Sequence, residues 1–175
     1  MLSDGEYTVK SAYQLLSMFQ RQKQASSSDM EVGKSLWNGI WKLRVLNKVR
    51  HFLWRAVQNS LPTKLNLYKR QVVSDGCCDI CRTCLEDNTH ALCYCDVVRA
   101  VWQTNVRFNF IRTKKLSTFA DLVQFLCSHG SFDLFAWFTM VAWSIWEQRN
   151  RLRVGQPSWQ VDEVVQQALE LLHEF

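Results

Sequence analysis

A mostly α-helical fold is predicted by the spacing of the apolar residues along the chain. In several segments they recur at i, i+3 and i+4, which is the pattern of one buried helix face, and no segment sustains the alternation of a strand. The 175 residues include two prolines and six glycines, which argues against a many-turned β fold. With 47% hydrophobic and 13% aromatic residues, the chain can bury a core, and wholesale disorder is excluded.

The first part of the chain predicts helices separated by polar loops. Thr8 can cap a helix over residues 9–22, and residues 24–33, with three consecutive serines, are typical of a flexible loop. A short amphipathic turn follows, and Asn47 is expected to cap the next helix. The apolar residues on the inner side of these two elements are Leu36, Trp37, Ile40, Trp41, Val49, Phe52, Leu53, Ala56 and Val57.

Further helices are predicted along the rest of the chain. Thr63 and Asp96 are expected to cap two of them. The basic and aromatic segment 105–117 is expected to form a loop or a short pair of strands. Long helices are predicted over residues 119–127, 132–152 and 161–174, the last two separated by Gly155-Gln156-Pro157.

Neither a secretory signal nor a membrane span is predicted. The N-terminal residues lack a basic segment followed by an apolar one. The most apolar stretch, from Leu134 to Trp146, has 13 residues, whereas a spanning helix needs about 20. We therefore expect an intracellular protein, in the cytoplasm or nucleus, in which this stretch is a buried helix.

The cysteines are concentrated in one short segment. Six of the seven lie between Cys77 and Cys95. In a chain without a secretory signal, such a cluster favours a metal site over a disulfide framework. Within it, Cys78, Cys81, His90 and Cys95 form a C-x2-C-x8-H-x4-C pattern. Three thiolates and one imidazole would fill all four positions of a tetrahedral ion, so we expect a structural rather than catalytic zinc site.

The spacing leaves other assignments open. Cys81 and Cys84 form a second, overlapping CxxC, and Cys77 and Cys93 are additional thiols. The cysteines could also be small buried side chains that pack as hydrophobes, a reading that suits Cys127 better than a cluster. A redox CxxC is the third reading, but the βαβ pattern that usually accompanies it is absent from the sequence.

Several stretches together resemble one family. The segment Asp4-Gly5-Glu6-Tyr7-Thr8-Val9-Lys10-Ser11-Ala12-Tyr13 is similar to the opening of the zinc-binding domain that follows reverse transcriptase in plant non-LTR (LINE-type) retrotransposon polyproteins. Further similar motifs follow in the family's order: Trp41-Lys42-Leu43, Lys48-Val49-Arg50-His51-Phe52-Leu53-Trp54-Arg55-Ala56, Leu61-Pro62-Thr63, the cysteine and histidine quartet, and Ala100-Val101-Trp102.

The resemblance implies a domain organisation and a ligand set. It favours Cys78 and Cys81 over Cys84 as ligands, and it leaves Cys93 as an alternative ligand or an incidental thiol. The zinc-binding domain would cover residues 4–104, and residues 105–175 would be a helical extension toward a ribonuclease H-like domain. The stretch Trp143-Ser144-Ile145-Trp146-Glu147-Gln148-Arg149-Asn150 resembles the segment before that domain. Reverse transcriptase or ribonuclease H-like domains of a parent polyprotein are therefore expected partners.

No enzymatic activity is expected. Reverse transcription needs paired carboxylates that hold two metal ions, and this sequence contains no adjacent Asp-Asp pair. We also expect the chain to end before a ribonuclease H carboxylate set. The resemblance therefore implies a non-catalytic module.

Nucleic acid is a candidate partner because basic residues cluster. Between Val32 and Ser74 the chain has nine basic residues and no acidic one, with aromatic residues interleaved. Cationic side chains bind phosphates and aromatic faces stack on bases of single strands, so RNA or DNA binding is predicted. The first candidates are Lys48, Arg50, Arg55, Lys69 and Arg70; a weaker basic stretch contains Arg107, Arg112, Lys114 and Lys115.

Two alternatives oppose that prediction. Trp41, Phe52 and Trp54 have core-like spacing, so most of these rings are expected to be buried, and the basic residues could be an ordinary solvated helix face. The chain could instead be a protein-interaction or scaffolding module, a truncated remnant of a polyprotein. In that case the apolar helix 132–146 would lie against a missing neighbour.

Overall fold

The computed structural model describes residues 27–114, 116–157 and 160–173. The chain divides into two units between Asn38 and Gly39. Residues 27–38 of the first unit belong to helix α2 (Ser27–Lys42), whose last turn lies in the second unit. All other described elements belong to the second unit. They are α3 (Asn47–Val57), α4 (Lys64–Lys69), the π-helical turn η1 (His90–Tyr94), α5 (Asp96–Gln103), the 3-10 turn η2 (Val106–Phe108), α6 (Asn109–Thr113), α7 (Phe119–His129), α8 (Phe132–Arg153) and α9 (Val161–His173).

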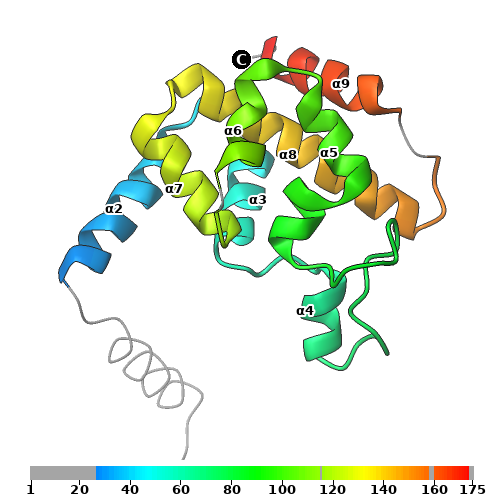
Figure 1. Cartoon of the computed structure of the whole chain (residues 1–175). Coiled ribbons are helices and arrows are strands. Elements are labelled where there is room, and N and C mark those ends of the chain that lie inside the picture. The colour runs from blue at the N-terminus through cyan, green and yellow to red at the C-terminus, as the bar shows by residue number, and fades with distance from the viewer. Residues whose placement is uncertain (1–26, 115, 158–159, 174–175) are drawn as a thin grey trace, which may run out of the picture. The chain divides into compact units, whose positions relative to one another are not determined.

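The predicted mostly α fold is confirmed. The described residues form helices and turns, and their β pairing is an isolated bridge between Cys77 and Leu85. Within the second unit, α8 runs behind α5 in Figure 1 and packs against α3, α7, α9 and η1. No helix among the described residues has the length and apolar character to cross a membrane.

Helix α8 forms the core of the second unit, as its composition predicts. Its buried residues lie on all sides of the helix from Phe135 to Arg149. Phe138 is fully buried, and its ring stacks on Trp102 at 5.0 Å between centroids and on Phe119 at 6.1 Å. From Phe135 to Trp146 the apolar surface of this helix is therefore largely covered within the second unit, whereas Phe132 at its start is 67% exposed.

Local capping explains where several helices begin. Thr63 Oγ1 accepts a hydrogen bond from the Asn66 backbone N–H, which confirms the predicted cap of α4. Thr118 and Asp121 form a capping box at the start of α7, and Ser131 caps α8. The break between α8 and α9 includes Gly155, whose φ of +71° suits glycine.

Two predicted caps are displaced by one residue. Asn47 is the first residue of α3 rather than its cap; Leu46 occupies the cap position without a capping side chain. The Asn47 side chain instead accepts a hydrogen bond from Arg50 Nη2 at 2.6 Å. Asp96 is likewise the first residue of α5, where its charge favours the helix N-terminus, and Cys95 holds the cap position.

Two predicted loops are helical instead. Helix α2 already begins at Ser27, inside the predicted loop 24–33, because serine is tolerated in the first turn of a helix. Segment 105–117 contains η2 and α6 rather than a loop or strands; Asn105 caps η2 by accepting from the Arg107 N–H. The helix predicted over residues 9–22 lies outside the described residues.

Candidate metal centre

The first two cysteines of the predicted quartet lie in a tight loop. The Cys78 N–H donates to the Cys84 oxygen at 2.9 Å, and the Glu86 N–H donates to the Gly76 oxygen at 2.9 Å, so the chain folds back on itself. Within the loop, the Arg82 N–H donates to the Cys78 oxygen, and Arg82 has a φ of +56°. This turn brings Cys81 back toward Cys78.

The other two members come from η1 and the residue after it. His90 is the first residue of this π-helical turn, and the Cys95 N–H donates to the His90 oxygen at 2.9 Å, an i to i+5 bond. The Asp87 carboxylate accepts a hydrogen bond of 2.7 Å from the His90 backbone N–H. The wide turn therefore places His90 and Cys95 together at the start of α5.

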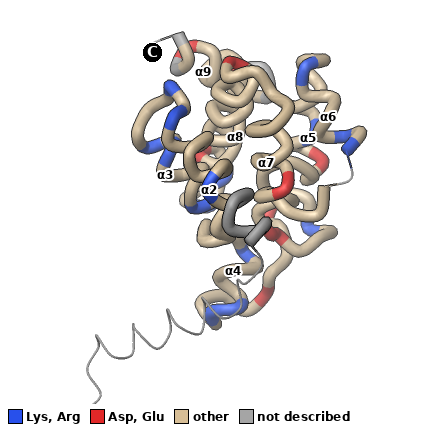
Figure 2. The backbone as a smooth tube through the Cα atoms, turned by 90° about the vertical axis from the view of Figure 1, so that its left-hand side faces the viewer, with Lys and Arg blue, Asp and Glu red and all other residues tan. Residues whose placement is uncertain are grey.

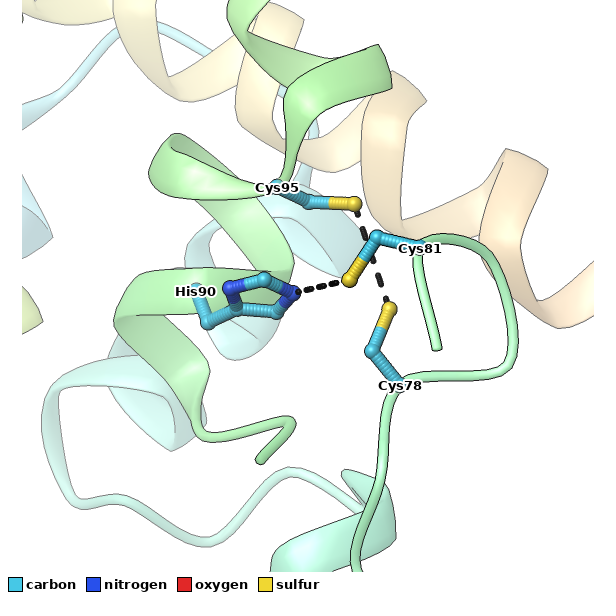
Figure 3. A group of neighbouring side chains, drawn as sticks. All are labelled: Cys78, Cys81, His90 and Cys95. Carbon is cyan, nitrogen blue, oxygen red and sulfur yellow. Dashed lines mark hydrogen bonds between the residues drawn. The ribbon is translucent and has the colours of Figure 1, made fainter. Parts of the chain in front are cut away.

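The structure brings all four predicted residues together (Figure 3). Their ligand atoms all lie within 4.8 Å of one another. The Sγ atoms of Cys78 and Cys95 are 3.9 Å apart, and Cys81 Sγ lies 3.3 Å from His90 Nε2. Ligands at tetrahedral zinc distances would be separated by about 3.8 Å for two sulfurs and about 3.6 Å for sulfur and nitrogen. The donor set and its spacing thus fit a four-coordinate zinc ion.

The remaining thiols of the cluster do not belong to this group. Cys77 and Cys84 are exposed, and Cys84 Sγ lies 3.7 Å from the Thr83 hydroxyl. Cys93 is buried outside the group, where burial raises the pKa of its thiol and keeps it protonated. Cys81, in contrast, has a thiol pKa lowered to about 6, chiefly by a hydrogen bond from the Thr83 side chain. A thiolate at neutral pH is the form that binds a metal.

Sequence reasoning missed a buried ion pair beside the centre. Arg149 on α8 is 2% exposed and donates from Nη2 to Cys78 Sγ at 3.0 Å and to Glu86 Oε2 at 2.6 Å. Burial disfavours the charged guanidinium, but the neighbouring Glu86 carboxylate raises the pKa of Arg149 above its ordinary value. The ion pair therefore stays charged against the cysteine cluster.

Glu86 is the centre of a wider polar network. It is 1% exposed, and its Oε1 accepts hydrogen bonds from Arg153 Nη2 and from the Lys64 backbone N–H. Arg153 also donates to the Pro62 oxygen at 2.8 Å, and Lys64 pairs with Asp79 at 2.9 Å. The sequence feature that could have indicated this network is the i, i+4 spacing of Arg149 and Arg153, which places both guanidinium groups on one side of α8.

The predicted nucleic-acid candidates fall into two groups. Lys48, Arg50 and Arg55 lie on α3, whereas Lys69 and Arg70 end α4. Figure 2 shows basic positions along both helices. Arg50 is half-buried and donates to the Trp41 oxygen and to Asn47, while the other four are exposed.

The expectation that the aromatic residues near these positions are mostly buried is wrong for two of three. Trp41 is 45% exposed and Trp54 is 39% exposed, whereas Phe52 is 3% exposed and packs on Trp143 and Trp146. The inner face of α3 consists of Val49, Phe52, Leu53 and Ala56, and this phase turns Trp54 outward.

Comparisons with known proteins identify the family. Residues 7–102 match the model of a family described as zinc-binding in reverse transcriptase. The chain is also 26% identical over 99 residues to an Arabidopsis thaliana protein named Putative ribonuclease H protein; the match covers 57% of this chain and 15% of the relative. No solved structure matches. Because the family model covers more than half of the chain and includes the whole quartet, the protein belongs to the family of zinc-binding domains found in reverse transcriptases.

Proposed function

We propose that this chain is a non-catalytic module in which Cys78, Cys81, His90 and Cys95 hold a structural zinc ion, and that helix α3 presents a surface for single-stranded nucleic acid. The observation that carries the first part is the convergence of four ligand atoms within 4.8 Å. Protein side chains would occupy all four positions, which leaves no open position for water or substrate. When bound, the ion would hold the loop, η1 and the start of α5 together.

Metal content tests the zinc assignment. Wild type should contain one zinc per chain by element-resolved mass spectrometry, and Cys81→Ser should contain much less. Cys84→Ser is the matched control, because Cys84 lies in the same loop but outside the group of four. Equal zinc content in wild type and Cys81→Ser would refute the ligand assignment.

The proposed nucleic-acid surface is the α3 face, defined here as Trp41, Lys48, His51, Trp54 and Arg55. All five side chains are exposed. The positions 48, 51 and 55 follow the i, i+3, i+7 spacing of one helix side, and Trp54 lies next to them. The Trp41 and His51 rings meet edge to face at 5.8 Å between centroids.

This combination of groups suits single strands better than duplexes. Exposed Trp faces can stack on unpaired bases, and cationic side chains beside them can bind the flanking phosphates. Arg50 helps to position Trp41 in this surface. Its Nη1 donates a hydrogen bond to the Trp41 backbone oxygen at 3.0 Å and so holds that residue beside α3. No acidic residue interrupts the segment from Val32 to Ser74.

Fluorescence anisotropy with a labelled single-stranded RNA tests this surface. If all five candidate cations (Lys48, Arg50, Arg55, Lys69 and Arg70) neutralise phosphates, the log–log salt slope should be about −3.5; the α3 members alone give about −2. Trp54→Ala should weaken binding without changing the slope, and Lys48→Gln should reduce the slope by about 0.7. Arg99→Gln, at an exposed position of α5, is the control outside both candidate basic stretches. No binding at low salt would end this proposal.

The burial of α8 weighs against the scaffolding alternative. That alternative relied on an apolar helix that needs a missing neighbour, but residues Phe135 to Trp146 are largely covered within the second unit. We therefore favour nucleic acid as the partner of the α3 face, and we propose that the module works beside reverse transcriptase or ribonuclease H-like domains of a parent polyprotein. A clean monomer in size-exclusion chromatography is expected; self-association would favour the scaffolding reading.

A further inference from the structure

Arg149 is a buried cation that contacts the candidate metal centre from a distant part of the sequence. It lies on α8, 71 residues after Cys78, and its Nη2 is 3.0 Å from Cys78 Sγ. A buried guanidinium needs acceptors, since an unpaired buried charge is strongly unfavourable. Its two N–H bonds at Nη2 point to two acceptors, the Cys78 sulfur and Glu86 Oε2.

The orientation of the guanidinium distinguishes this contact from a simple ion pair. An Arg optimised for a carboxylate presents two nitrogens to the two oxygens. Arg149 instead uses Nη2 alone, placed between sulfur and carboxylate, while its Nε and Nη1 have no hydrogen-bond partner among the described residues. Glu86 also has other partners, Arg153 and the Lys64 N–H. Arg149 is therefore held by the Cys78 sulfur as well as by Glu86.

The contact between Arg149 and Cys78 also balances the charge of the metal centre. Three thiolates and a neutral imidazole around a divalent zinc ion carry a net charge of −1. Arg149 supplies +1 next to Cys78, Glu86 supplies −1 next to Arg149, and Arg153 supplies +1 next to Glu86. The charges of these four groups, the metal centre, Arg149, Glu86 and Arg153, alternate in sign and sum to zero. Buried charges are tolerated when they are paired and hydrogen-bonded in this way.

Resting on the zinc site proposed above, we propose that Arg149 is a positioning residue of the metal centre. Its guanidinium orients Cys78 Sγ and offsets the negative charge of the thiolate-rich site. The centre would then be completed by a residue outside the matched segment 7–102, on the helix that follows it. Groups that hydrogen-bond to metal ligands typically change metal affinity by about 10–100-fold when removed.

Zinc competition with a chromogenic chelator on the full chain tests this role. Arg149→Met should weaken zinc binding about 10–100-fold. Arg153→Met is the matched control. It removes the same charge one turn away, also from Glu86, but the described polar contacts of Arg153 are with Glu86, Asp79 and the Pro62 oxygen rather than with Cys78. The zinc affinity of Arg153→Met should stay within about threefold of wild type. Equal losses in both variants would overturn the proposal.

Cobalt spectra give a readout that a purely structural role would not move. A hydrogen bond to sulfur lowers the energy of its lone-pair electrons, so its loss should shift the thiolate-to-cobalt charge-transfer band to longer wavelength. The shift is expected in Arg149→Met and not in Arg153→Met. An unshifted band together with wild-type zinc affinity in Arg149→Met would overturn the assignment.

Two further variants separate the thiolate contact from the ion pair. Glu86→Gln removes the carboxylate charge and leaves Arg149 beside Cys78, so zinc affinity should be retained; a loss equal to that of Arg149→Met would contradict the proposal. If Arg149→Met does not fold, the double variant Glu86→Gln/Arg149→Met replaces it in the comparison with wild type, because removing both charges leaves neither one buried without a partner. The double variant should still show the weaker affinity and the shifted band, and wild-type values would overturn the proposal.

The failure of the zinc site itself would look different. If the wild type binds neither Zn²⁺ nor Co²⁺ at one ion per chain, the proposed function fails and the role of Arg149 fails with it. If the wild type binds one ion and the Arg149 variants match it in affinity and spectrum, the zinc site stands and only the role of Arg149 is rejected.

Discussion

Asn88 donates a hydrogen bond of 2.7 Å from Nδ2 to the backbone oxygen of Ala56, and this bond is buried. It joins the segment between Cys81 and His90 to the last turn of α3. The two residues are 32 positions apart, so the contact forms only when the cysteine segment and α3 are both folded. It thereby links the candidate metal centre to the helix that carries the α3 face.

Removal of this link should lower stability. In Asn88→Ala, a buried acceptor loses a donor, and the free energy of unfolding should fall by about 1–3 kcal/mol. Urea denaturation of the zinc-loaded protein measures the change. Gln103→Ala, at an exposed position of α5, should stay within about 0.5 kcal/mol of wild type. Equal stability of Asn88→Ala and wild type would show that the hydrogen bond contributes nothing.

Loss of one metal ligand should unfold a defined segment. Structural zinc sites have apparent binding energies of about 10–16 kcal/mol, which exceeds the net stability of most domains. Cys81→Ser should therefore lose hydrogen-exchange protection across residues 77–102, while Cys127→Ser should keep it. Retained protection in Cys81→Ser would mean that packing alone holds the segment.

The thiols should react in an order set by exposure and metal binding. Cys77 and Cys84 are exposed and should be alkylated first at pH 8. Cys127 should react slowly, because burial raises its thiol pKa to about 11 and only about one thousandth is thiolate at that pH. The alkylation rate of Cys127 should rise as the pH approaches 11, because the fraction of reactive thiolate increases with pH until it levels off above the pKa.

The same labelling reports on the metal. Cys78, Cys81 and Cys95 should become reactive only after a chelator is added, and the buried Cys93 should become reactive with them, because loss of the metal is expected to unfold residues 77–102. Peptide mass spectrometry identifies each labelled site. Rapid labelling of Cys81 in zinc-loaded protein, at the rate seen with chelator, would contradict its role as a ligand.

Features that depend on nearby residues were predicted well from the sequence. Helices α3 and α7 follow from apolar periodicity, α8 follows from a long stretch that is apolar on nearly every side, and Thr63 caps α4 as its residue type predicts. The quartet spans only residues 78 to 95, so its spacing alone constrains which atoms can meet. The boundary at residues 104/105 stays a prediction; in the structure, helices from both sides of it pack together.

Features that depend on distant packing were not predicted. Trp54 has core-like spacing, but the side of α3 that faces the core is selected by α8 through contacts such as Phe52 with Trp143. The pairing of Glu86 with Arg149 joins residues 63 positions apart, and no local pattern specifies it. In segment 105–117, the Asn105 cap and the burial of Phe108 and Ile111 favour helical turns over the extended pairing considered from the sequence.

The stacking of Phe138 on Trp102 makes a last prediction, about how the two parts of the chain depend on each other. Phe138 belongs to α8 and Trp102 to α5, so their contact crosses the predicted boundary at residues 104/105. Phe138→Ala should leave a cavity in the core and lower the free energy of unfolding by about 3–5 kcal/mol. Trp102 also donates a hydrogen bond from its indole N–H to the backbone oxygen of Leu92, inside η1, at 2.8 Å. The loss of stability in Phe138→Ala should therefore also destabilise the metal centre.

Two probes followed in one urea unfolding experiment test whether the core and the metal centre unfold together. Tryptophan fluorescence reports on the core, and release of zinc to a chromogenic chelator reports on the centre. In Phe138→Ala both midpoints should shift together to lower urea, as expected for one cooperative unit. Phe132→Ala is the control, because the same residue type on the same helix is 67% exposed there and should change little. If the fluorescence midpoint falls while zinc release keeps its wild-type midpoint, then residues 105–175 fold independently of the metal centre.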